Sequence, residues 1–144
     1  MAAQEQDQLA RTIYEAFNTN DFDRVLSLST ADVEVATMAF GLTQHGHDGF
    51  RQFMQGWKGM APDSRVEVVS QLAGAEGVTN ECRFRGTHTG PLRSPSGEIP
   101  PTGRSFDAPF VEVWRIRDGK LASLHNYFDT LTLLQQLGIS QPPG

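Results

Sequence analysis

The sequence predicts an α+β fold in which helices pack on one face of a curved antiparallel sheet. Two patterns predict this class. Apolar residues recur at helical spacing in much of the first 60 residues, and alternating segments joined by turn signals fill most of the remainder. The chain has 144 residues, which suits a single domain over residues 1–144 with a sizeable core.

Three helices are expected in the first part of the chain. In residues 4–18 the apolar positions recur every three or four residues, and Tyr14 lies at the edge of that stripe. A short helix follows Asp21, whose side chain suits an N-cap. The third helix is expected over residues 48–60, where four large apolar side chains share one face.

The remaining segments read mostly as strands and turns. Alternation and β-branched residues predict strands, and Pro and Gly predict irregular connections. An Asp118-Gly119 pair favours a two-residue hairpin, and Asp129 caps a short helix over 130–137 that Gly138 ends. Strands are expected at 33–36, 65–73, 78–89, 105–117 and 120–128, loops at 38–46 and 90–103, and a frayed tail at 141–144.

The composition excludes several classes of protein. Seventeen acidic and 12 basic residues give a net charge of −5, which disfavours nucleic-acid binding. No apolar run approaches the roughly 20 residues that a membrane helix needs, and the first residues do not resemble a secretory signal. The single cysteine, Cys82, excludes an internal disulfide and a cysteine-based zinc cluster. We therefore expect a cytoplasmic protein that binds neither nucleic acid nor membrane.

One acidic residue stands among apolar residues in the expected strand 105–117. Alternation places Glu112 on the same face as Phe110 and Trp114. Burial there would raise the pKa of the carboxyl group, as general acid–base catalysis near neutral pH requires. The alternative is a half-exposed face on which Glu112 pairs with an arginine.

Several short motifs, in order and spacing, resemble the SnoaL-like polyketide cyclases, which have the ketosteroid-isomerase-like or nuclear-transport-factor-like cone fold. The resemblance covers nearly the whole chain. It is carried by residues 16–21, 23–25, 86–92, 100–104, 115–121, 129 and 136–138. It implies a curved antiparallel sheet wrapped around N-terminal helices, as an α+β barrel or cone with one deep apolar pocket. It also implies ring closure by intramolecular aldol chemistry without a cofactor or metal.

The resemblance also implies a catalytic Asp on the last strand, supported by a Gln and a His on the preceding strand. Spacing from the Asp118-Gly119 turn puts these three positions on Asn126, Phe110 and Glu112 respectively. An asparagine does not exchange protons under ordinary conditions. We therefore expect Glu112, across the hairpin from Asn126, to have taken over the acid–base role, with Asn126 holding a substrate oxygen.

The remaining candidate residues complete the predicted site. His88, at the inner end of its strand, is the third catalytic candidate, although a structural role is as frequent for such a histidine. Glu34 is expected near the pocket, although a glutamate in a short edge strand is more often solvated. His45 and His47 are weak evidence for a metal, and none is expected. The expected substrate-binding residues are Tyr14, Glu34, Met54, Trp57, Phe84, Phe110 and Trp114.

The sequence leaves three functions open. The first is a cofactor-independent enzyme that cyclises or isomerises a small, apolar, oxygenated substrate of polyketide type. The second is a non-catalytic ligand-binding domain of the same fold, which Asn126 in place of the family's Asp favours. The third is an assembly module, because Val111 and Val113 make the outer face of their strand partly apolar. A homodimer is expected in each case.

Overall fold

The computed structural model describes residues 1–139, so the tail expected at 141–144 lies outside the described residues. Its helices are α1 (Ala3–Asn18), α2 (Phe22–Ser27), α3 (Gly46–Met60) and α4 (Thr130–Gln136), with one 3-10 turn, η1 (Met38–Phe40). Its strands are β1 (Ser29–Thr37), β2 (Leu42–His45), β3 (Arg65–Ala73), β4 (Gly77–Thr87), β5 (Leu92–Ser94), β6 (Gly97–Ile99), β7 (Ser105–Arg117) and β8 (Lys120–Phe128). None of the described helices is long and apolar enough to cross a membrane.

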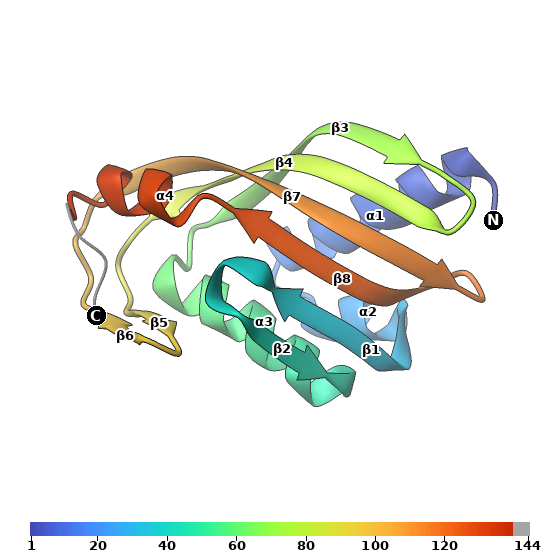
Figure 1. Ribbon diagram of the computed structural model, residues 1–144, viewed down its shortest axis with the longest axis horizontal. Coiled ribbons are helices and arrows are strands. Elements are labelled where there is room, and N and C mark those ends of the chain that lie inside the picture. The colour runs from blue at the N-terminus through green and yellow to red at the C-terminus, as the bar shows by residue number, and fades with distance from the viewer. Residues whose placement is uncertain (140–144) are drawn as a thin grey trace.

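Six strands form one curved, unclosed sheet in the order β2-β1-β8-β7-β4-β3 (Figure 1). The predicted α+β class is confirmed. The expectation of a wholly antiparallel sheet is wrong at one place, because β1 and β8 pair in parallel. Hairpin turns fix the direction of β3 relative to β4 and of β7 relative to β8, whereas no short turn connects β1 to β8 and signals its direction.

Two segments that were expected as loops contain strands. In the first, η1 ends at Gly41, which has a φ of 63°, and β2 then pairs antiparallel with β1. In the second, β5 and β6 form a small separate hairpin. Both β2 and the hairpin are short and largely exposed, so they lack the alternating burial that marks a strand in sequence.

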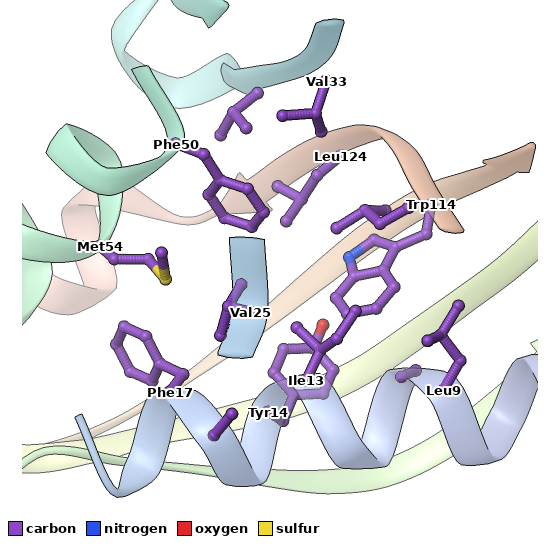
Figure 2. Packing of buried hydrophobic residues seen from close by; sticks show 14 of the residues in the cluster. Leu9, Ile13, Tyr14, Phe17, Val25, Val33, Phe50, Met54, Trp114 and Leu124 are labelled. Carbon is purple, nitrogen blue, oxygen red and sulfur yellow. The ribbon is translucent and has the colours of Figure 1, made fainter. Parts of the chain in front are cut away.

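The helices cover one face of the sheet and complete the core. Helix α1 packs against β3 and β4, and α3 packs against β1 (Figure 1). Figure 2 shows Ile13 and Phe17 of α1 directed toward side chains from the sheet and from α2 and α3. On β7 the burial alternates as predicted, with Phe106, Ala108, Phe110, Glu112 and Trp114 all facing inward.

Candidate active site

A cavity lies between the helices and the concave face of the sheet. Its empty volume, counted to the mouth that opens to solvent, is about 680 Å³. The wall consists largely of aromatic and aliphatic side chains. The lining residues are Ile13, Tyr14, Phe17, Val25, Phe50, Phe53, Met54, Trp57, Val66, Phe84, Ala108, Pro109, Phe110, Glu112, Trp114, Leu124, Asn126, Phe128 and Leu133.

The Glu112 carboxylate is the polar centre of this cavity, and its residue is only 4% exposed. Three side chains hydrogen-bond it. The Tyr14 hydroxyl donates to Oε1 at 2.7 Å, and the Trp114 indole nitrogen donates to the same oxygen at 3.1 Å. The Asn126 amide donates to Oε2 at 2.8 Å. Helix α1 and strands β7 and β8 thus fix both oxygens of one carboxylate.

Two opposing effects determine the charge of Glu112. Removal from water favours the neutral acid and raises the pKa, whereas the bonds from Asn126, Tyr14 and Trp114 favour the carboxylate and lower it. Burial is the larger effect, so the pKa of Glu112 lies above its ordinary value. Its pKa therefore moves toward neutral pH, where such a group can both take up and release a proton.

Tyr14 acts on Glu112 as a neutral hydrogen-bond donor. Burial, together with the neighbouring Glu112 charge, raises the pKa of the Tyr14 phenol well above 10. The same two causes raise the pKa of the Cys82 thiol to about 12. Neither group forms an anion near neutral pH, so Glu112 is the group in this cluster that can exchange a proton with a substrate.

Asn126 and Glu112 occupy facing positions on β8 and β7, as the hairpin predicted. Asn126 is 5% exposed and lines the cavity. Its Nδ2 donates to Glu112, while its Oδ1 has no hydrogen-bond partner among the described residues. The amide therefore offers a free acceptor beside the carboxylate.

The structure does not bring His88 together with Glu112. His88 is buried but does not line the cavity. Its backbone bonds to Gly103 and Arg104, and its Nδ1 lies 3.2 Å from the Thr102 backbone nitrogen and 3.0 Å from the Thr102 hydroxyl. Burial lowers the pKa of His88, which favours the neutral ring. Through these contacts the buried His88 anchors residues 102–104, which is a structural role.

Glu34 also lies outside the cavity lining, contrary to the sequence-based expectation. Val33 and Val35 turn into the core, so the alternation of β1 directs Glu34 to the opposite face. There its carboxylate contacts His125 at 2.8 Å. Within residues 1–139, no three His, Cys, Asp or Glu side chains are arranged to hold a metal ion.

The other predicted binding residues do line the cavity, namely Tyr14, Met54, Trp57, Phe84, Phe110 and Trp114. The sequence missed two of the three donors that hold Glu112. The sequence pattern predicts Tyr14 and Trp114 as wall residues and gives no sign of the hydrogen bonds that they donate. The pairing of a helix residue with a strand residue 98 positions away leaves no local signal in the sequence.

The curved sheet over helices, with a buried acid in an interior cavity, places the chain in the ketosteroid-isomerase-like class of α+β folds. A solved protein of that fold from Catenulispora acidiphila has a TM-score of 0.75 at 18% identity, covering 91% of this chain and 92% of its own. The family model of the SnoaL-like polyketide cyclases matches residues 7–137, and the chain belongs to this family.

Two further solved structures share the fold. A protein of Jannaschia sp. CCS1, regarded as a SnoaL-like polyketide cyclase, has a TM-score of 0.84 at 18% identity, covering 98% of this chain and 95% of its own. IdmH of Streptomyces antibioticus, regarded as a polyketide cyclase, has a TM-score of 0.77 at 25% identity, covering 93% and 99%. A sequence search of curated proteins finds no significant match.

Proposed function

We propose that this protein is a cyclase-type enzyme that moves a proton on an apolar, oxygenated, polyketide-like substrate, with Glu112 as the acid–base group. The single observation that carries the proposal is the Glu112 carboxylate, held by three donors inside an otherwise apolar cavity. Family membership supports cyclase-type chemistry.

The proposed step uses only side chains of this chain. Glu112 takes a proton from a carbon next to a substrate carbonyl, and the electron pair moves to the carbonyl oxygen to give an enolate. In cyclisation, the enolate carbon attacks a second carbonyl of the same molecule and forms the new carbon–carbon bond. The proton on Glu112 then passes to the resulting alkoxide, so the enzyme ends in its initial state.

The two oxygens of Glu112 are suited to different roles. Oε1 receives two hydrogen bonds, from Tyr14 and Trp114, whereas Oε2 receives one, from Asn126. The extra donor makes Oε1 the less basic oxygen. We assign proton uptake to Oε2, beside which Asn126 contacts a substrate oxygen.

The experiment measures enolisation directly and needs no knowledge of the natural substrate. The probe is 1-tetralone in deuterium oxide, with deuterium incorporation at C2 followed by NMR. The wild type should accelerate exchange, and Glu112→Gln should reduce that acceleration by about 100-fold or more. Glu34→Gln is the matched control, since Glu34 lies outside the cavity lining, and its rate should equal that of the wild type.

The alternative function is non-catalytic ligand binding, which the asparagine at position 126 favours. Trp57 and Trp114 are the only two tryptophans, and both line the cavity, so tryptophan fluorescence reports its occupancy. Binding of 1-tetralone without any acceleration of exchange would favour this alternative. Equal acceleration by the wild type and Glu112→Gln would refute the role given to Glu112.

A further inference from the structure

Asn126, a residue of the cavity wall, holds an unpaired acceptor oxygen that limits which ligands suit the cavity. Asn126 Oδ1 is buried and lacks a partner within residues 1–139, and the side chain lines the cavity. A buried carbonyl oxygen without a hydrogen bond is costly. A ligand that donates a hydrogen bond here would remove that cost.

The orientation of the Asn126 amide follows from its neighbour. An ionised carboxylate only accepts hydrogen bonds, so the amide nitrogen must face Glu112 Oε2, at 2.8 Å. The reverse orientation would place two acceptor oxygens against each other. Oδ1 therefore keeps no partner among the described residues while Glu112 is ionised.

The charge of the cavity wall limits the ligand further. Among the described lining residues, Glu112 is the sole acidic side chain, and no lysine, arginine or histidine accompanies it. The buried cation Lys58 lies over the Phe17 ring, but its Nζ donates to the backbone carbonyls of Ser64 and Asn18. An anionic ligand would thus be buried beside a carboxylate without a countercharge.

We infer that the cavity selects a ligand without negative charge that has an apolar body and a hydroxyl group donating to Asn126 Oδ1. This deepens the proposed function and rests on it in taking this cavity as the substrate site. The inferred substrate class is a hydroxyl-bearing molecule without negative charge. The hydroxyl positions the adjoining carbon atoms near Glu112 Oε2.

Three ligands with one apolar body test this class: 1-adamantanemethanol, its methyl ether and adamantane-1-carboxylate. The quenching or shift of tryptophan fluorescence gives a Kd for each, with calorimetry as a second measurement. The alcohol should bind about tenfold more tightly than the ether, which leaves the acceptor unpaired. The carboxylate should bind at least about tenfold more weakly than the alcohol. Equal affinity for the alcohol and the ether, or for the alcohol and the carboxylate, would overturn the inference.

The variant Asn126→Leu tests whether the preference for the alcohol over the ether depends on Asn126 Oδ1. Asn126→Leu removes the acceptor at similar size, so the alcohol and ether should then bind within about twofold of each other. Phe128→Leu is the control, because it alters the wall without removing a polar group, and it should keep the preference. A preference that persists in folded Asn126→Leu would contradict the role of this atom. These tests need no turnover, so they can fail while the exchange experiment succeeds, and the reverse.

Discussion

Replacement of Glu112 by glutamine should stabilise the protein at neutral pH. The folded state raises the pKa of Glu112, chiefly by burial, so folding favours the protonated form. The contribution to stability is fully present below the unfolded pKa of about 4.5 and is lost as the pH rises through the folded pKa. Glutamine does not titrate and avoids this loss.

The packing suggests that glutamine fits the same space. Its Oε1 can keep the bonds from Tyr14 and Trp114, and a rotated Asn126 amide can accept a bond from its Nε2. Each unit by which the folded state raises the Glu112 pKa costs about 1.4 kcal/mol at neutral pH. For a chain of 144 residues, 1 kcal/mol corresponds to roughly 3–5 °C in Tm.

Thermal denaturation of both proteins between pH 4 and pH 8 measures this difference. The Tm of Glu112→Gln minus that of the wild type should rise from about pH 4.5 and level off above the folded pKa. A Tm difference that stays constant or falls with rising pH would refute a raised Glu112 pKa. Urea denaturation gives the same difference as a free energy of unfolding.

Three further outcomes are expected. Tyr14→Phe removes a donor to the Glu112 carboxylate, so the pKa of Glu112 should rise further. At neutral pH, urea denaturation should show a free energy of unfolding that is lower by about 1–3 kcal/mol. A deuterium-exchange rate with the same pH dependence as in the wild type would contradict the rise in pKa. Burial lowers the pKa of His88, so the wild type loses stability as the pH falls below about 6.5. Thermal melts from pH 7 to pH 5 should show a smaller fall in Tm for His88→Gln than for the wild type. An equal fall in Tm for the two proteins would argue against a lowered His88 pKa. In Gly77→Ala the new Cβ would lie 1.9 Å from a carbonyl oxygen of the facing strand, a clash expected to cost about 3 kcal/mol or more. Gly56→Ala in α3 has nothing within 4 Å, so it should instead stabilise by up to about 1 kcal/mol, and equal effects of the two changes would refute the clash.

Most of the fold could be predicted from the sequence, because each long helix or strand has its own periodic pattern. Alternation on β7 correctly placed Glu112 and Trp114 inward, and the Asp118-Gly119 turn correctly set Glu112 opposite Asn126. The direction of β1 could not be read in this way, because its pairing with β8 joins residues about 90 positions apart. Short exposed strands such as β2 also lack a pattern.

The candidate site was predictable where one strand or one hairpin defines it. The position of Glu34 follows from the local pattern, because Val33 and Val35 mark the buried face of β1 and place Glu34 on the opposite face. The bond from Tyr14 to Glu112 depends on how α1 lies on the sheet, which no local pattern specifies. The homodimer stays a prediction.

The pH dependence of proton exchange tests the role of Glu112 most directly. Deuterium exchange into 1-tetralone is measured across pH 4–9, and the Glu112 carboxyl carbon is titrated by NMR in the same protein. The rate should increase with pH along a curve whose pKa equals that of Glu112 and exceeds 4.5, since the ionised carboxylate is the base. A rate that follows a different pKa, or a Glu112 that titrates at or below 4.5, would contradict the account.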